Sequence, residues 1–314
     1  MSGLIAMRIA VACSVCIVAL VVASAAGQSG GAPPSRVAVT FDDLPDHGPL
    51  PPGVSRVDVA KSILGTLRAR HAPPVYGFIN ARQLEAHPAD EEVLRLWREA
   101  GFPLGNHTFS HMDLHASTSE DFERDVIANE ATLRSHMGAG DWHWFRYPYL
   151  REGNTGDKYR TVREMLARRG YRIAQVTLSF DDYAYNDPYA RCAARNDREG
   201  IAWLEKSYRE RAAESLDRGR DAARAAFGRD ISHVMLLHIG AFETVMLPRL
   251  LDLLHDRGFV LTPLEDAEAD AAYKTVPEAR GTWSGTLLEQ MAVARGAPPS
   301  PPDVIFTKLD ALCR

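Results

Sequence analysis

The sequence lacks several features that would place it in a special class of protein. After residue 22 no apolar run is long enough to span a membrane, so we expect a soluble mature protein with no stable membrane insertion. No cysteine follows the first apolar run at the place where a lipid anchor would need one. The formal net charge of −5 gives no electrostatic reason to expect nucleic acid as a partner. With 46% hydrophobic and 25% charged residues, the composition is that of a globular protein and not of a collagen, a coiled coil or a disordered chain.

The first 26 residues have the pattern of a signal peptide. Arg8 supplies a positive charge, residues 9–22 form an uncharged apolar stretch, and residues 23–25 (ASA) offer a small-x-small cleavage site. The apolar stretch is shorter than the roughly 20 residues of a membrane span, which favours a cleaved signal over an uncleaved anchor. We therefore expect export to the periplasm or out of the cell. A flexible linker rich in proline and glycine should follow at residues 27–35.

Cysteine usage agrees with export. Cys13 and Cys16 lie in the predicted signal segment, which leaves Cys192 and Cys313 in the mature chain. An even number of cysteines in an oxidising compartment predicts a disulfide between them, tying the C-terminal tail to a mid-chain loop. The alternative is two separate buried thiols.

From residue 36 onward, short apolar runs alternate with stretches of helical period. The predicted strands lie at residues 37–41, 75–79, 102–104, 142–145, 172–178, 234–237 and 259–261. The predicted helices lie at residues 57–70, 91–100, 119–137, 155–169, 196–227, 242–256 and 287–294. Such alternation predicts an α/β fold of parallel strands joined by crossover helices.

About seven such units favour a distorted (β/α) barrel, complete or incomplete, over the alternative of an open doubly wound sheet. The barrel should span residues 36–265, with the long amphipathic helix at 196–227 inserted between two strands. Residues 266–314 should form a C-terminal extension that packs on the barrel.

Polar residues follow five of the predicted strands directly. They are Asp42 and Asp43, Asn106 and His107, Arg146, Asp181 and Asp182, and His238. In a parallel barrel the carboxyl ends of the strands meet at one face, where active sites lie. We therefore expect these five groups to converge.

Each group also has a simpler interpretation. Asp42 and Asp43 could cap a turn, Arg146 could be an ordinary surface arginine, and His238 a core histidine. His107 and His111 are four residues apart and would share one face of a helix, which suits a divalent metal. His115 extends this series, but we assign it to the surface or to the surroundings of the site, because a carboxylate from another strand completes the ligand set equally well.

Four segments in this order resemble the motifs of the polysaccharide deacetylase family, the NodB-like carbohydrate esterases. They are residues 40–43 (TFDD), 106–111 (NHTFSH), 146–149 (RYPY) and 236–238 (LLH). The resemblance covers residues 36–265. It implies a distorted (β/α) barrel that removes acetyl groups from glycans with a divalent metal.

The resemblance also implies a role for individual residues. Asp43, His107 and His111 would hold the metal, zinc being the usual ion and cobalt or nickel alternatives. Asp42 would be the general base that takes a proton from the attacking water. A Lewis-acidic metal next to a carboxylate suits this chemistry, because it lowers the pKa of water toward neutral.

Three further residues would complete the reaction. Arg146 would orient Asp42 and hold it ionised, and the backbone N–H of Tyr149 would stabilise the oxyanion. His238 would protonate the leaving amine as the general acid.

The sequence departs from the family pattern in two places. Where the family continues with Gly-Pro after the two aspartates, residues 44–49 read LPDHGP, and we do not expect His47 in this insertion to lie near the metal. Ser179 stands where the family has the aspartate that tunes the acid histidine. Asp181 or Asp182 would then take its place, and the pattern does not choose between them.

These observations favour a metal-dependent hydrolase that removes N-acetyl groups from a chitin-type chain, peptidoglycan or an exopolysaccharide. One alternative is an O-acetyl esterase acting on a polysaccharide such as xylan. Another is a catalytically weak glycan-binding protein, which would need neither Asp42 nor His238. The expected partner in every case is an acetylated glycan.

Overall fold

Seven parallel strands form the centre of the protein. They are β1 (Ser35–Leu44), β2 (Gly77–Ile79), β3 (Leu104–Asn106), β4 (Trp144–Phe145), β5 (Arg172–Ile173), β6 (His233–His238) and β7 (Phe259–Leu261). Six of them are hydrogen-bonded in the order β5-β4-β3-β2-β1-β6, and β7 pairs with the first residues of β1. A parallel bridge from Leu178 to Met235 joins the segment after β5 to β6, so the two ends of this order meet at one point. The predicted distorted barrel of parallel strands is confirmed, and the open doubly wound sheet is not formed.

The strand β1 is the axis of this arrangement. Its apolar residues Val37, Val39 and Phe41 are at most 5% exposed, and β1 pairs with β6 in register from Val37 opposite His233 to Asp42 opposite His238. Ala38 and Thr40, which point to the other face, are buried too, and a strand covered on both faces needs uncharged side chains in both directions. This is why residues 37–41 carry no charge and only one polar side chain. The last residues of β1 and β6 are therefore adjacent at the carboxyl edge of the sheet.

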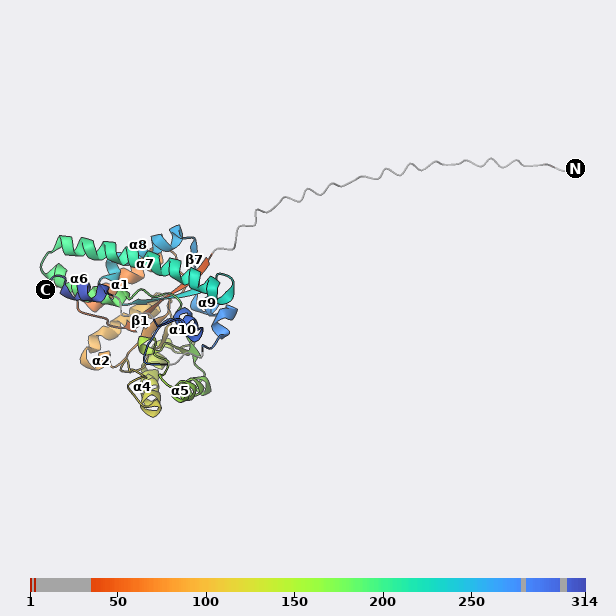
Figure 1. Cartoon of the computed structure of the whole chain (residues 1–314), viewed down its shortest axis with the longest axis horizontal. Helices are drawn as coiled ribbons and strands as arrows, with labels where there is room; N and C mark the ends of the chain where they lie inside the picture. Colours follow the sequence, from red (N-terminus) through yellow and green to blue (C-terminus); the bar gives the residue numbers. More distant parts are fainter. Residues whose placement is uncertain (2, 4–34, 278–280, 300–303) are drawn as a thin grey trace. The chain divides into compact units, whose positions relative to one another are not determined.

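Seven helices occupy the predicted ranges to within two residues at either end. They are α1 (Arg56–Ala69), α3 (Glu91–Glu99), α4 (Ser119–Met137), α5 (Gly156–Arg168), α7 (Arg198–Phe227), α8 (Glu243–Asp256) and α10 (Leu287–Ala294). Side-chain oxygens of Ser55, Thr118 and Thr155 cap α1, α4 and α5 by accepting a backbone N–H of the first turn. In Figure 1, α7 runs along one side of the barrel and α4 and α5 lie on the opposite side.

Several short helices were not predicted. They are α2 (Gln83–Ala86), α6 (Asn186–Ala194), α9 (Leu264–Glu268) and α11 (Ile305–Ala311), with 3₁₀ turns η1 (Pro88–Asp90), η2 (Pro148–Leu150), η3 (Asp182–Tyr185) and η4 (Ala271–Lys274). Segments this short give no clear helical period in the sequence. Two of them, η2 and η3, carry residues of the candidate site.

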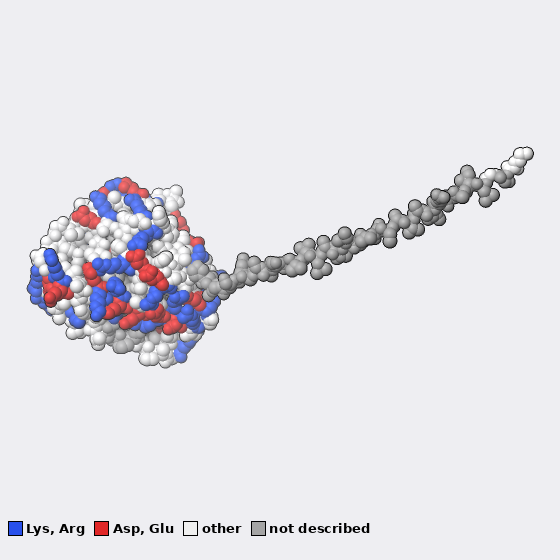
Figure 2. All heavy atoms as spheres, turned by 90° about the horizontal axis from the view of Figure 1, so that it is seen from above, with Lys and Arg blue, Asp and Glu red and all other residues white. Residues whose placement is uncertain are grey.

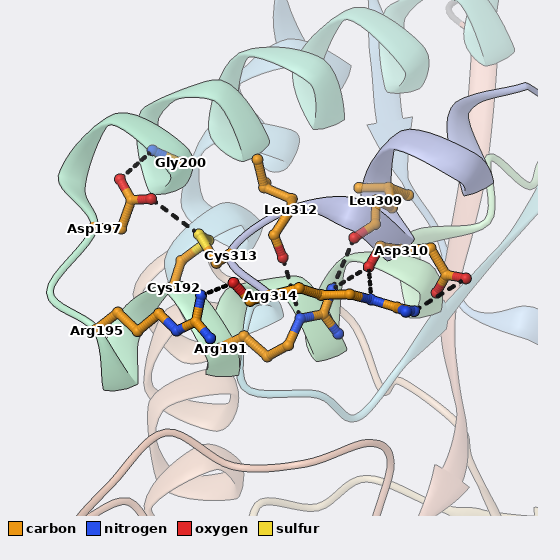
Figure 3. The surroundings of a disulfide bond; sticks show 10 residues. All are labelled: Arg191, Cys192, Arg195, Asp197, Gly200, Leu309, Asp310, Leu312, Cys313 and Arg314. Atoms are coloured by element: carbon orange, nitrogen blue, oxygen red, sulfur yellow. Dashed lines mark hydrogen bonds and ion pairs between the residues drawn. A yellow bond between two sulfur atoms is a disulfide. The ribbon is translucent and has the colours of Figure 1, made fainter.

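The predicted disulfide between Cys192 and Cys313 is present, with 5.1 Å between the Cα atoms. It ties the tail to α6 and not to a loop, as Figure 3 shows. Arg191 reinforces the attachment, because its Nε donates to the carbonyl of Leu312 at 3.1 Å and its Nη2 to that of Leu309 at 2.8 Å. Further along the extension, α10 packs against α7.

The structure, a computed structural model, describes residues 1, 3, 35–277, 281–299 and 304–314. The predicted signal peptide, apart from residues 1 and 3, and residues 27–34 of the predicted linker lie outside the described residues. Within the described ranges, no helix combines the length and the apolarity needed to cross a bilayer. On the face seen in Figure 2, acidic and basic residues are closely intermixed.

Candidate metal and catalytic site

The five predicted polar groups do meet at the carboxyl edge of the sheet. Asp42 and Asp43 belong to the end of β1, His107 directly follows β3, Arg146 directly follows β4 and His238 ends β6. Of the fifth group, Asp182 begins η3 and contacts His238. Asp42, Asp43, His107, Arg146 and Asp182 are at most 7% exposed, whereas the side chains of His238 and Asp181 are 12% and 41% exposed. Convergence follows from the parallel order of the strands.

Three of these side chains form a candidate metal centre. A carboxylate oxygen of Asp43 and one ring nitrogen each of His107 and His111 lie within 4.8 Å of one another. The Oδ1 atom of Asp43 is 3.5 Å from Nε2 of His107 and 3.4 Å from Nε2 of His111. The same Oδ1 is buried and accepts no hydrogen bond within the described residues. An orphaned carboxylate oxygen facing two imidazole nitrogens is a donor set that fits zinc.

The histidines of this centre are in the protonation state that a ligand requires. Burial lowers the pKa of His107 and of His111 to about 4, although the nearby Asp43 carboxylate opposes the shift. Both imidazoles are therefore neutral at neutral pH. His107 is also oriented, because its Nδ1–H donates a hydrogen bond to the carbonyl oxygen of Arg146 at 2.8 Å, which leaves Nε2 as the ring nitrogen that can bind an ion.

The prediction that His107 and His111 share a helix face is wrong. The segment from residue 107 to residue 118 is irregular, and Thr108 and His111 have positive φ angles of 61° and 56°. The backbone N–H of Thr108 donates to Oδ1 of Asn106 at 2.9 Å, which starts a turn in place of a helix. A loop with left-handed residues, and not helical spacing, brings the two rings within 4.9 Å.

Two asparagines that the sequence interpretation missed hold this loop. Nδ2 of Asn80 donates to the carbonyls of His107 and Thr108, at 2.6 and 3.0 Å. Asn129 donates to Oδ1 of Asn106 at 2.9 Å. Asn80 directly follows a predicted strand, so its position could have marked it as a site residue. Asn129 lies within a predicted helix, where nothing in the sequence distinguishes it.

Asp42 lies beside the metal centre but outside it. Nη1 of Arg146 is 3.2 and 3.4 Å from its two carboxylate oxygens. Arg146 is itself fixed, since Nε donates to the carbonyl of Ala174 at 2.7 Å and Nη2 to Oγ1 of Thr40 at 3.1 Å. Its guanidinium also lies over the ring of Phe78, 4.6 Å from the centroid. The orientation of Asp42 by Arg146 is therefore built into the fold.

The expectation that Arg146 keeps Asp42 ionised needs a correction. Burial raises the pKa of Asp42 to about 6, because the loss of water outweighs the opposing charge of Arg146. The carboxylate thus forms only above about pH 6. A base with a pKa near the working pH is well matched to proton transfer.

The ring of Tyr149 contacts the ring of His111, with 4.4 Å between the ring centroids. Tyr149 sits in η2 with a positive φ of 58°, and it is 52% exposed. In the part of the chain that the structure describes, its backbone N–H has no hydrogen-bond acceptor. The ring contact with His111 brings Tyr149 to the edge of the candidate metal centre, and its N–H has the chemistry that an oxyanion requires of a donor.

His238 is paired with Asp182. Its Nδ1 lies 2.9 Å from Oδ1 of this aspartate, and its backbone N–H donates to Oδ2 at 2.7 Å. Asp181 points to Arg211 instead, at 3.6 Å, and the carbonyl of Ser179 accepts a bond from Ser215. The structure thus selects Asp182 from the two alternatives.

The pairing controls the charge of His238. Burial alone would lower its pKa, but the charge and hydrogen bond of Asp182 raise it to about 9. The imidazole is therefore protonated at neutral pH, which is the state of a proton donor.

Two further aromatic rings border His238. His47, which we did not expect near the metal, lies with Nδ1 2.7 Å from Oδ2 of Asp43 and its ring 4.9 Å from that of His238. Tyr183 is 40% exposed and lies 5.3 Å from the His238 ring. His115, by contrast, is not part of the three-residue cluster.

Comparison with known proteins bears on the family and the fold. The model of the family described as polysaccharide deacetylase matches residues 29–174. A search of curated proteins found no match. Among solved structures, a chitin deacetylase from the fungal pathogen Colletotrichum lindemuthianum is similar, with a TM-score of 0.51 and 23% identity over 76% of this chain and 89% of that chain. A family 4 carbohydrate esterase pseudoenzyme from Bacillus anthracis gives a TM-score of 0.51 and 12% identity over 74% of this chain and 65% of that chain.

At these identities the structural likeness shows the fold. The family match covers the candidate metal centre, Asp42, Arg146 and Tyr149, and it ends before Asp182 and His238. The resemblance of this chain to the polysaccharide deacetylase family is confirmed, and its barrel has the fold of the family 4 carbohydrate esterases.

Proposed function

We propose that the protein is a metal-dependent hydrolase that removes N-acetyl groups from an amino-sugar polysaccharide such as a chitin-type chain, peptidoglycan or an exopolysaccharide. One observation carries the proposal. A buried carboxylate with a pKa of about 6 and a protonated imidazole with a pKa of about 9 border the same three-residue metal centre. Two titratable groups whose pKa values are pushed apart mark the base and the acid of a reaction.

Asp43, His107 and His111 would hold the metal, with zinc favoured by the one oxygen and two nitrogen donors. When bound, the ion supplies Lewis acidity, which makes the attacking water more acidic and polarises the acetyl carbonyl. The chain's own residues carry out the proton transfers.

Asp42 is the general base. It takes a proton from the water that attacks the acetyl carbonyl, and Arg146 holds its two oxygens in place. The backbone N–H of Tyr149 donates to the oxyanion as the carbonyl carbon becomes tetrahedral. The exposed phenol ring of Tyr149 lies at the surface, where it borders the incoming sugar.

His238 is the general acid. Cleavage of an amide requires protonation of the departing nitrogen, because an amine anion is a very poor leaving group. Asp182 keeps His238 charged and holds its ring by Nδ1, which directs the other ring nitrogen to the substrate. The acid favours N-acetyl groups over O-acetyl groups, since an ester needs less help at this step. A protein that only binds glycans needs neither group.

The domain organisation belongs to the same proposal. A signal peptide at residues 1–26 and a linker at 27–35 would precede a deacetylase barrel at residues 36–265 and an extension at 266–314. Export to the periplasm or the cell exterior is supported by the signal-like sequence and by the Cys192–Cys313 disulfide. The proposed glycan substrates occur in those compartments.

The test is a screen for acetate release from chitin oligomers, peptidoglycan and acetylxylan. Acetate should appear from at least one amino-sugar substrate, disappear after metal is stripped with a chelator, and return when zinc or cobalt is added. Acetylxylan as the best substrate would favour the O-acetyl esterase. Full activity in the chelator would refute the metal-dependent mechanism, and no release from any substrate with metal bound would favour the glycan-binding protein.

A further inference from the structure

The loop after β1 turns back onto the metal centre. Asp43 has a positive φ of 67°, and the backbone N–H of Asp46 donates to its carbonyl oxygen at 2.8 Å. This turn reverses the chain directly after the two aspartates. As a result, the ring of His47 lies against the carboxylate four residues earlier, with 2.7 Å between Nδ1 and Oδ2 of Asp43.

The loop is fixed from behind by α1. Nη1 of Arg56 donates to the carbonyl of His47 at 3.2 Å and its Nη2 to that of Gly48 at 2.5 Å. Arg56 also forms an ion pair with Asp46. These contacts fix the backbone of the loop at His47, and the His47 side chain is only 22% exposed.

The two oxygens of Asp43 have different surroundings. Oδ1 faces the rings of His107 and His111 and accepts no hydrogen bond within the described residues. Oδ2 faces His47. An ionised carboxylate only accepts hydrogen bonds, so Nδ1 of His47 carries the proton and donates it. Within the part of the chain that the structure describes, this is the hydrogen bond that fixes the carboxylate.

We propose that His47 is a positioning residue for the metal ligand Asp43: by donating from Nδ1 to Oδ2, it turns Oδ1 toward His107 and His111. The inference rests on the metal centre of the proposed function and extends it to a residue that stands outside the resemblance. Groups that hydrogen-bond to a metal ligand typically change metal affinity by about 10- to 100-fold when removed. His47 should have an effect of that size.

The test measures zinc affinity directly, by competition with a chromophoric chelator, on purified full-length variants. His47→Ala removes the donor and should weaken zinc binding about 10- to 100-fold. His47→Asn keeps an N–H donor near the position of Nδ1 and should restore most of that affinity. His115→Ala is the matched control, because His115 belongs to the same irregular segment as His111 but not to the three-residue cluster, and the zinc affinity of this variant should equal that of the unmodified protein.

A second readout separates positioning from folding. The visible absorption spectrum of the cobalt-substituted protein reports the ligand field, so His47→Ala should alter it and His47→Asn should return it toward that of the unmodified protein. Thermal melts of the metal-free variants check that all of them fold.

Several outcomes would overturn the inference. Equal zinc affinity in His47→Ala and the unmodified protein would show that the hydrogen bond does not matter. A folded His47→Asn as weak as His47→Ala would mean that His47 acts otherwise than as an Nδ1 donor. An unmodified protein that binds no zinc would overturn both this inference and the proposed function. Zinc binding that depends on His47 without any acetate release would refute only the proposed function.

Discussion

The Nδ1 atom of His238 lies 2.9 Å from Oδ1 of Asp182, while the backbone N–H of the same histidine binds the other oxygen of that carboxylate. The aspartate therefore fixes both the main chain and the ring of the proposed acid. It also raises the pKa of His238 to about 9 against the effect of burial. The proposed base, Asp42, has a pKa of about 6. The proposed reaction requires Asp42 to be ionised and His238 to be protonated at the same time.

The rate should consequently depend on pH in a bell shape. Asp42 works as a base only above its pKa, so kcat/KM should rise as the pH increases through about 6, or at a lower pH once a bound cation stabilises the carboxylate. His238 works as an acid only below its pKa, so the rate should fall as the pH passes about 9. A pH series of acetate release on the metal-loaded protein measures both limbs. A rate that stays level to pH 11 would contradict the acid assignment.

Asp182→Asn should shift only the fall in kcat/KM at high pH and leave the rise at low pH unchanged. Loss of the negative charge lowers the pKa of His238, so the fall in kcat/KM should begin at a lower pH than in the unmodified protein. Asp181→Asn is the matched control, because Asp181 pairs with Arg211 and should leave the limb nearly in place. Equal displacement by the two variants would mean that the direct contact is not what tunes His238.

Asp42→Asn should bind metal but lose turnover. The amide can still accept a bond from Arg146, but it cannot take a proton from water, and general-base catalysis contributes about 10²- to 10⁴-fold to a rate. Metal content of the purified variant and its kcat are measured side by side. A variant that keeps its rate would remove Asp42 from the role of base, and one that loses its metal would place Asp42 among the ligands.

His238→Ala should discriminate between leaving groups. An amide substrate needs a proton on its nitrogen and should lose about 10²- to 10⁴-fold in kcat. An activated acetate ester has a leaving group that departs without a proton, so its rate should fall much less. Parallel assays with both substrates give the ratio directly. Equal losses would count against His238 as the acid.

Removal of the disulfide should lower stability. Cys192 and Cys313 are separated by 121 residues, and a bridge that closes a loop of this length typically contributes about 2–4 kcal/mol to the free energy of unfolding. Urea unfolding of the Cys192→Ala/Cys313→Ala double variant should show a loss of that order relative to the oxidised protein. The reduced unmodified protein is the control and should resemble the variant. A double variant as stable as the oxidised protein would mean that the arginine contacts of the tail suffice.

The main elements of the fold were predictable because their signals are strong. The uncharged, mainly apolar stretch at residues 37–41 of β1 reflects burial on both faces, and the long helices carry both a periodic apolar face and polar caps such as Thr118. The predicted strand at residues 172–178 was too long, because only Arg172 and Ile173 pair regularly with β4, and the segment meets β6 at Thr177 and Leu178 through an isolated bridge. This stretch crosses the junction between the two ends of the sheet, where regular pairing stops.

Within the site, residues at strand ends were predictable and contacts through irregular backbone were not. Parallel topology places Asp42 and His238 together without any knowledge of side chains. The position of His47 depends on the left-handed Asp43, and the choice of Asp182 depends on the left-handed Asp181, whose φ is 58°. A spacing pattern carries no information about such a backbone angle in a residue other than glycine.

The bridge between Cys192 and Cys313 also has a consequence for how the tail is held. Cys192 lies in α6, which directly follows the 3₁₀ turn that carries Asp182, and Phe306 of the tail lies against Tyr183 with the ring centroids 6.4 Å apart. The bridge therefore joins the tail covalently to the helix beside the proposed acid side of the site, and it can form only where thiols are oxidised. In a reducing environment the contacts of Arg191 and the Tyr183–Phe306 pair would hold the tail there without a covalent bond.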